Sequence, residues 1–177
     1  MAALEHRRFY DLPILRRNPE GRTVKLSIEL VPRTLPKLEQ ELQAVAEHFP
    51  HIDTVNIPDL LRFETRSWQA CACAKRFMPR AIPHLRAIDI DLSKPLKIAP
   101  FLEANSLREV LVVAGDAPAD MSRTVYDTSS VQVIRKLRRE LPQVTVYAAL
   151  DPYRQSFAAE LAYAEAKLEA GASGVFT

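Results

Sequence analysis

The sequence has little glycine and little cysteine. Four glycines and two cysteines occur among 177 residues, whereas ordinary glycine usage is about 7 %. Gly115 is therefore expected to mark a tight turn or a close approach of the backbone to something bound. Cys71 and Cys73 lie two positions apart in an alanine-rich, helix-like stretch. Because such positions do not face each other on a helix, neither a disulfide nor a shared metal fits, and small buried helix residues are predicted.

Long apolar runs and an excess of one charge are also missing. No run approaches the roughly 18 to 20 apolar residues that a membrane span needs, and residues 1–13 lack the apolar core of a signal peptide. The net charge of +2 gives no reason to expect nucleic acid or an anionic membrane as a partner. His48 and His51 have no further ligand nearby, so no metal site is expected. These absences predict a cytoplasmic, soluble globular protein.

What the sequence does have is a regular alternation of strand-like and helix-like segments. Strands are predicted at residues 23–32, 53–59, 87–92, 107–113, 144–150 and 174–177. Helices are predicted at residues 34–49 with Thr34 as the cap, 67–78 with Ser67 as the cap, 95–105, 129–141 and 156–170. The unbroken apolar run at 110–113 is typical of a strand buried on both faces.

Alternating βαβ units of this kind predict a parallel sheet covered by helices. Two architectures share that order: a doubly wound open sheet and the first part of a (β/α)₈ barrel, which takes about 250 residues when complete. Residues 1–22 are polar and basic and are interpreted as an N-terminal arm, followed by one domain over residues 23–177.

Four fragments resemble, in order, motifs of the methylenetetrahydrofolate reductase family. Residues 27–34 resemble the family's first-strand Ser-Phe-Glu-Phe with a following Pro and Thr, and residues 83–85 match its Pro-His-Leu before strand three. Residues 115–118 with Tyr126 resemble its Gly-Asp-x-Pro loop and following Tyr, and residues 167–172 resemble its Lys-x-Asp-Ala-Gly-Ala helix end. The resemblance favours a (β/α)₈ TIM barrel of that type, with about six strands present.

The resemblance also implies an activity. The family reduces 5,10-methylenetetrahydrofolate to 5-methyltetrahydrofolate with NADH or NADPH, usually through bound FAD, in one-carbon metabolism and methionine biosynthesis. Opening the methylene bridge needs a proton, and a carboxyl group held partly away from water keeps one near neutral pH. Glu29 matches the general acid of the family and Asp116 the aspartate beside the flavin. From the residues alone, Glu29 is more often an outward-facing or ion-paired strand residue, and Asp116 a turn former or helix cap.

Further residues match the family's cofactor contacts: His84, Gly115, Asp116, Tyr126, Arg154 and Lys167. His84 matches a flavin contact, although it could also be a histidine that closes a loop before a strand. Lys167 matches a phosphate contact, although a lysine in the last turn of a helix is equally explained by the helix dipole. Arg154, after the fifth strand, can bind a phosphate.

Departures from the family pattern leave alternatives open. Ala114 stands where the family has an arginine, Asn56-Ile57 replaces a Thr-Tyr pair, and the aromatic residue and histidine after strand five are missing. A flavin-free enzyme that passes hydride directly from nicotinamide to folate therefore remains possible. Because the chain is about two βα units short, it is expected to be a fragment of a longer enzyme, a homo-oligomer or partner-completed subunit, or a non-catalytic folate- or flavin-binding barrel.

Overall fold

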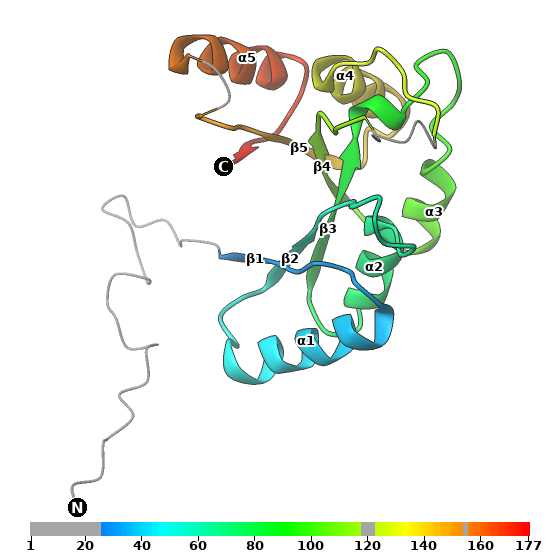
Figure 1. The fold of residues 1–177 in the computed structure, drawn as a ribbon, viewed down its shortest axis with the longest axis vertical. Helices are drawn as coiled ribbons and strands as arrows, with labels where there is room; N and C mark the ends of the chain where they lie inside the picture. The colour runs from blue at the N-terminus through cyan, green and yellow to red at the C-terminus, as the bar shows by residue number, and fades with distance from the viewer. Residues whose placement is uncertain (1–25, 118–122, 154–155) are drawn as a thin grey trace, which may run out of the picture.

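The computed structural model describes residues 26–117, 123–153 and 156–177. Within these ranges six parallel strands form a single sheet in the order β1-β2-β3-β4-β5-β6 (Figure 1). The strands are β1 Ser27–Glu29, β2 Thr54–Ile57, β3 Arg80–Arg86, β4 Glu109–Val113, β5 Thr145–Ala149 and β6 Val175–Phe176. A doubly wound sheet reverses its strand order at a switch point, whereas a barrel adds each strand beside the one before. The order therefore confirms a TIM-barrel-like half-barrel.

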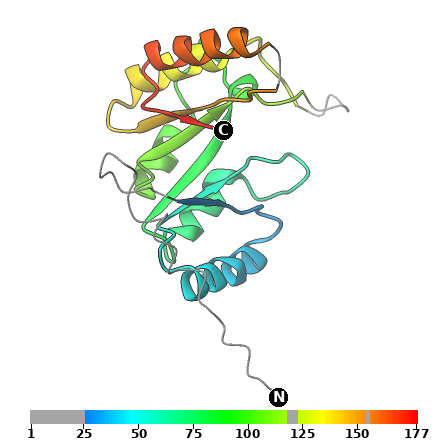
Figure 2. The ribbon, with the colours of Figure 1, turned by 90° about the vertical axis from the view of Figure 1, so that its left-hand side faces the viewer.

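The helices cover one face of this sheet (Figures 1 and 2). They are α1 Leu35–His48, α2 Ser67–Ala74, α3 Ala99–Ala104, α4 Ser130–Glu140 and α5 Phe157–Glu169. Thr34 caps α1 as predicted, because its side chain accepts a hydrogen bond from the Lys37 backbone N–H. Ser67 does not cap α2; it is the first helical residue, and its hydroxyl donates to the His84 carbonyl oxygen at 2.6 Å.

Side-chain alternation divides the strand residues between two environments. Val55, Leu85 and Val112 are buried against the helices in the main hydrophobic core. Ile82 and Leu111 are equally buried, with exposures of 0 % and 3 %, but they lie outside that core. They belong to the inner face of the half-barrel, which is also the face that carries most of the polar strand side chains.

A cluster of three polar side chains on the inner face joins β3, β4 and β5. Arg80 donates from Nε to Glu109 Oε2 at 2.9 Å, and the Tyr147 hydroxyl donates to Glu109 Oε1 at 3.0 Å. The Tyr147 ring stacks on Phe176 of β6 with 5.2 Å between ring centroids. This network stabilises the register of the strands on the side away from the helices.

One predicted strand is misplaced, and one predicted helix is shorter than expected. The third strand was expected at residues 87–92, but β3 ends at Arg86 and the chain continues as a short 3₁₀ turn over Ala87–Asp89. Pro83 lies inside β3 opposite Ile57, although a proline cannot donate to the strand ladder. The helix expected at 95–105 is reduced to α3, because residues 90–98 form an irregular segment.

Both cysteines lie in α2. Cys71 is fully buried, as predicted, and Cys73 is half-buried with its thiol 3.3 Å from Glu39 Oε1; neither forms a disulfide.

No helix in the part of the chain that the structure describes is long and apolar enough to cross a membrane. No cluster that could hold a metal ion occurs in the same part. The predicted arm at residues 1–22 lies outside the described residues.

Candidate functional site

Side chains from β1, β2 and β3 meet on the inner face near the carboxyl ends of these strands. The Asn56 amide nitrogen donates to Ser27 Oγ at 2.9 Å and to the Ile28 carbonyl oxygen at 3.3 Å. Asn56 Oδ1 lies 2.9 Å from His84 Nε2. Because Oδ1 is an acceptor, Nε2 of His84 carries the proton and Nδ1 is the acceptor nitrogen. Asn56 thus fixes the histidine tautomer, and it was recognised in the sequence only as a departure from the family pattern.

His84 is neutral near pH 7, although it lies close to the expected general acid. Burial lowers the pKa of His84 to about 4, which outweighs the opposing attraction of Asp59. Glu29 Oε2 lies 4.0 Å from His84 Nε2, so the contact joins a carboxyl group to a neutral imidazole and is no ion pair. His84 is a residue within β3, and the alternative of a loop histidine before a strand is wrong.

Glu29 is the last residue of the edge strand β1, and its side chain is 56 % exposed. The register pairs it with Asn56 on β2, which places it on the inner face. The position agrees with a general acid at the mouth of a barrel. The partial shielding from water that a general acid needs is not seen in the described residues.

The second predicted carboxylate, Asp116, lies at the end of β4, on the same edge of the parallel sheet. Its side chain is exposed, and its backbone carbonyl oxygen accepts a hydrogen bond from Arg86 Nη2. Gly115 has a φ of +84°, and a Cβ there would lie 2.9 Å from Arg86 Nε. The conformation needs glycine, as its positive φ shows, and the close approach of the backbone is to Arg86, a buried residue of the same chain.

Three charged residues that the sequence did not single out meet just beyond β2 and β3. Arg66 donates from Nε to Asp59 Oδ1 at 2.8 Å, from Nη2 to Asp59 Oδ2, and from Nη2 to Asp89 Oδ2 at 3.3 Å. The Asp59 side chain is 1 % exposed. The pKa of Arg66 is raised chiefly by its hydrogen bond to Asp59. The signal that could have found them is positional, since Asp59 and Asp89 each follow a strand at its carboxyl end.

Lys167 lies at the carboxyl end of β5. Its ammonium donates to the Ala149 carbonyl oxygen at 2.6 Å and lies 4.0 Å from Glu160 Oε1. Both side chains are buried. Lys167 therefore reaches from α5 to a strand end, and stabilisation of the helix dipole alone does not account for its position. Glu160, its buried neighbour, was not identified from the sequence.

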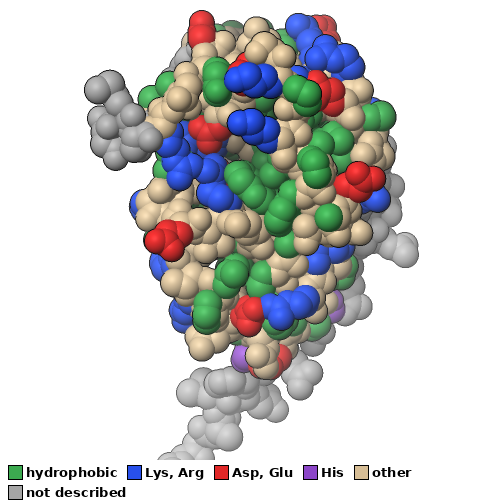
Figure 3. Space-filling view, turned by 90° about the vertical axis from the view of Figure 1, so that its right-hand side faces the viewer, with side chains coloured by type: hydrophobic (Ala, Val, Ile, Leu, Met, Phe, Trp, Pro, Cys, Tyr) green, Lys and Arg blue, Asp and Glu red, His purple; other side chains and the backbone are tan. Residues whose placement is uncertain are grey.

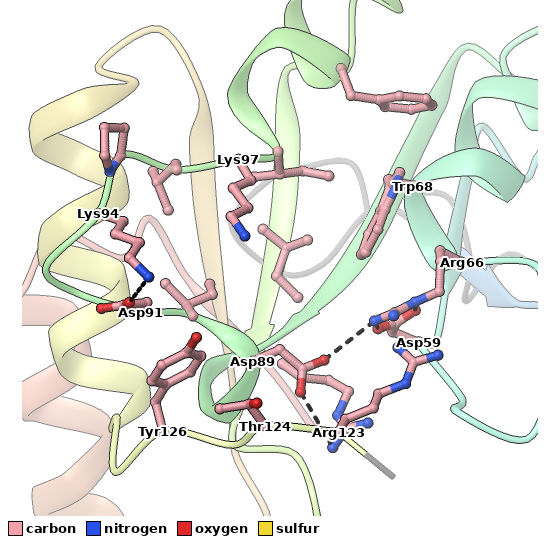
Figure 4. A pocket seen from close by; sticks show the side chains of 17 residues that line it. Asp59, Arg66, Trp68, Asp89, Asp91, Lys94, Lys97, Arg123, Thr124 and Tyr126 are labelled. Atoms are coloured by element: carbon pink, nitrogen blue, oxygen red, sulfur yellow. Dashed lines mark hydrogen bonds and ion pairs between the residues drawn. The ribbon is translucent and has the colours of Figure 1, made fainter.

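Tyr126 lies apart from the Glu29–Asn56–His84 group. Tyr126 lines a pocket beside Trp68 and Phe101 (Figure 4), and its backbone N–H donates to the Ile88 carbonyl oxygen at 2.8 Å. Arg154 lies outside the described residues. The structure thus brings Glu29 and His84 together, and it does not bring Tyr126 to them.

The sequence matches a known family. The sequence model of the methylenetetrahydrofolate reductase family matches residues 15–177. The chain belongs to the methylenetetrahydrofolate reductase family. A curated relative, the 5,10-methylenetetrahydrofolate reductase of Buchnera aphidicola subsp. Schizaphis graminum (strain Sg), is 26 % identical over 96 residues. That alignment covers 54 % of this chain and 33 % of the relative, so it spans about a third of the relative's length.

Solved structures with a similar fold come from another enzyme. The carboxyl transferase domain of Rhizobium etli pyruvate carboxylase with oxalate matches 88 % of this chain and 27 % of that chain, with a TM-score of 0.55 and 15 % identity. The same domain with 3-hydroxypyruvate matches 83 % of this chain and 26 % of that chain, with a TM-score of 0.52 and 13 % identity. At such low identity these matches show only the TIM-barrel-like fold.

The contact of Arg86 with Asp116 bears on one departure from the family pattern. Ala114, directly before Gly115, stands where the family pattern has an arginine. In this chain a guanidinium nevertheless lies beside the Gly-Asp turn, because Arg86 reaches it from the neighbouring strand β3. Arg86 therefore places a guanidinium beside Gly115 and Asp116 from a different strand.

Proposed function

We propose that this chain supplies five βα units and the sixth strand of a methylenetetrahydrofolate reductase barrel of eight units, and that the completed barrel reduces 5,10-methylenetetrahydrofolate with NADH or NADPH. The observation that carries the proposal is the meeting of Glu29, Asn56 and His84 on the inner face at one end of the sheet. Asp116 follows β4 at the same edge. Barrel enzymes bind their substrates at this carboxyl end.

In the proposed reaction Glu29 is the general acid. The bond between the methylene carbon and one folate nitrogen breaks, that nitrogen takes the proton from the Glu29 carboxyl group, and the carbon takes a hydride. Neutral His84 and Asn56 shape the floor beside Glu29 without adding a fixed charge. Asp116, held through its backbone by Arg86, faces the solvent where the substrate would enter.

A flavin is proposed as the cofactor, with its ring on the inner face. His84, Gly115 and Asp116 would hold the ring at the ends of β3 and β4, and a neutral His84 can lie against an uncharged ring. Arg154 and Lys167 would hold the phosphates of FAD. In the structure the Lys167 ammonium donates to the Ala149 carbonyl oxygen. When bound, the flavin would supply a hydride carrier between nicotinamide and folate.

The test is the replacement of Glu29 by Gln in the completed enzyme. Methylenetetrahydrofolate-dependent oxidation of NADH should be lost, whereas the flavin absorbance and the oxidation of NADH by an artificial acceptor should remain. Glu103→Gln, at an exposed site on α3, is the matched control and should behave as wild type. Normal folate reduction in the Glu29→Gln variant would refute the role of this residue.

A second candidate is a folate- or flavin-binding barrel without catalytic activity. The exposed position of Glu29 and the bonds that already engage Lys167 favour it. Such a protein would bind methyltetrahydrofolate or flavin but would not oxidise NADH when methylenetetrahydrofolate is added. Its size in solution should also exceed the 20.0 kDa of one chain if a partner completes the barrel.

A further inference from the structure

The pocket that Tyr126 lines is on the outer side of β3, away from Glu29. It has a volume of about 510 Å³ and lies between α2, α3, the segment after β3 and residues 123–126 (Figure 4). Its floor includes Leu85, whose side chain belongs to the helix-facing core, whereas the adjacent His84 points to the inner face. Small-molecule sites are usually clefts of about 300 to 1,000 Å³. The pocket is therefore large enough for a ligand, and neither Glu29 nor His84 lines it.

Aromatic side chains line this pocket. Trp68 from α2, Phe101 from α3 and Tyr126 face it, above a floor that includes Ile90. The guanidinium of Arg66 lies 4.6 Å from the Trp68 ring centroid, which holds the indole in place. Surfaces of this kind favour flat aromatic groups, which stack on or pack edge-on against such rings.

The charges around the pocket are unequal. Five cationic residues line it, Arg66, Arg86, Lys94, Lys97 and Arg123, against three carboxylates, Asp59, Asp89 and Asp91. The carboxylates are all engaged: Asp59 and Asp89 by Arg66, and Asp91 by Lys94 at 3.2 Å.

Lys97 supplies positive charge that these carboxylates do not neutralise. Among the described residues no ion pair joins Lys97 to a carboxylate, and its amino group points into the pocket (Figure 4). Figure 3 shows the same side of the molecule, where lysine and arginine side chains surround an apolar area. A cation beside an apolar floor is a site for an anionic group, since the low polarity strengthens the attraction.

The segment that carries Lys97 is anchored to α4. Lys136 Nζ donates to the Leu92 carbonyl oxygen at 3.2 Å, and the Leu96 backbone N–H donates to Glu140 Oε2 at 3.0 Å. The Thr128 hydroxyl donates to the Ile90 carbonyl oxygen at 3.1 Å. The pocket wall is therefore held in place before any ligand binds, which reduces the entropy lost on binding.

We propose that this pocket binds a small organic anion that carries a flat aromatic group. The aromatic group lies against Trp68 and Phe101, and the anionic group contacts the Lys97 ammonium. The site is distinct from the proposed folate site, because Glu29, Asn56 and His84 do not line it; Arg86, which also contacts Asp116, lies between the two.

Trp68 makes the proposal directly testable, because it is the single tryptophan of the chain. Adenosine monophosphate is the probe, with adenosine and inorganic phosphate as the two half-ligands. We expect a saturable change of tryptophan fluorescence with adenosine monophosphate, and a clearly weaker response to either half-ligand. Lys97→Met should weaken binding about tenfold or more through loss of a charge-assisted contact.

Lys94→Met is the matched control, since it removes a neighbouring rim lysine whose charge is already neutralised by Asp91. It should change the affinity by less than about twofold. The proposal is overturned if wild type shows no saturable response, if adenosine alone binds as well as the monophosphate, or if the two lysine variants behave alike. Both lysines are exposed, so neither replacement should unfold the chain, and circular dichroism checks this.

Discussion

Arg86 donates a hydrogen bond from Nη2 to the backbone carbonyl oxygen of Asp116, 30 residues further along the chain. This bond ties the end of β3 to the turn after β4. It is possible only because Gly115 has no Cβ, since an added Cβ would lie 2.9 Å from Arg86 Nε and 3.1 Å from Ile88 Cγ1. The turn that presents Asp116 therefore depends on a buried guanidinium as well as on local backbone preference.

Gly115→Ala tests this dependence. The φ of +84° and the contact with Arg86 should together lower the free energy of unfolding by about 1–3 kcal/mol. Gly174→Ala is the control, because a Cβ at Gly174 would meet nothing closer than Tyr147 Cδ1 at 3.7 Å. Chemical denaturation of both variants gives the comparison. Equal free energies of unfolding for the two variants would show that neither the positive φ nor the Arg86 contact opposes alanine at position 115.

The buried His84 predicts a defined pH dependence of stability. Its pKa is about 4 in the folded chain against 6.5 for the free side chain. Between these values the unfolded chain binds a proton that the folded chain does not, so stability falls as the pH drops from about 6.5 to about 4 and is unaffected by His84 above that window. The loss amounts to roughly 3 kcal/mol at most. Urea unfolding at several pH values should show that His84→Gln removes this part of the slope; an unchanged slope would contradict it.

Lys167→Met distinguishes a structural role from a simple dipole effect. The ammonium is bonded to Ala149 at 2.6 Å and lies 4.0 Å from the buried Glu160 carboxylate. Removing it should cost about 3–5 kcal/mol, as for other broken buried ion pairs, whereas a helix-dipole contribution would be about 0.3–1 kcal/mol. Lys75→Met is the control, since Lys75 also donates to a carbonyl oxygen but is exposed. A loss below about 1 kcal/mol would favour the dipole explanation.

The inner-face network predicts an order of stability for two variants. Tyr147→Phe removes one hydroxyl donor to Glu109 and should cost about 1–2 kcal/mol. Arg80→Met removes the charged partner of the same carboxylate and should cost about 2–4 kcal/mol. Burial and the neighbouring Glu109 carboxylate both raise the pKa of the Tyr147 phenol, so it should still be a hydrogen-bond donor up to pH 10. Thermal unfolding of the two variants checks the order, and its reversal would contradict this account.

The sequence by itself determined the order of the elements, the parallel sheet and the cap of the first helix. Apolar periodicity and cap chemistry are local, so Thr34, the α4 and α5 segments and the Val110–Val113 strand could be recognised without coordinates. The choice of a barrel over a doubly wound sheet came from the family resemblance, and the strand order confirmed it.

Only the tertiary structure decided where β3 lies and what surrounds the predicted site residues. Residues 87–92 alternate apolar and acidic side chains as a strand would, yet Asp89 is a partner of Arg66 beyond the strand end. The contacts Asn56–His84, Arg86–Asp116 and Lys167–Ala149 each join two segments far apart in the chain. Such contacts depend on register and on which strand ends meet, which are properties of the assembled sheet and leave no trace in a local pattern.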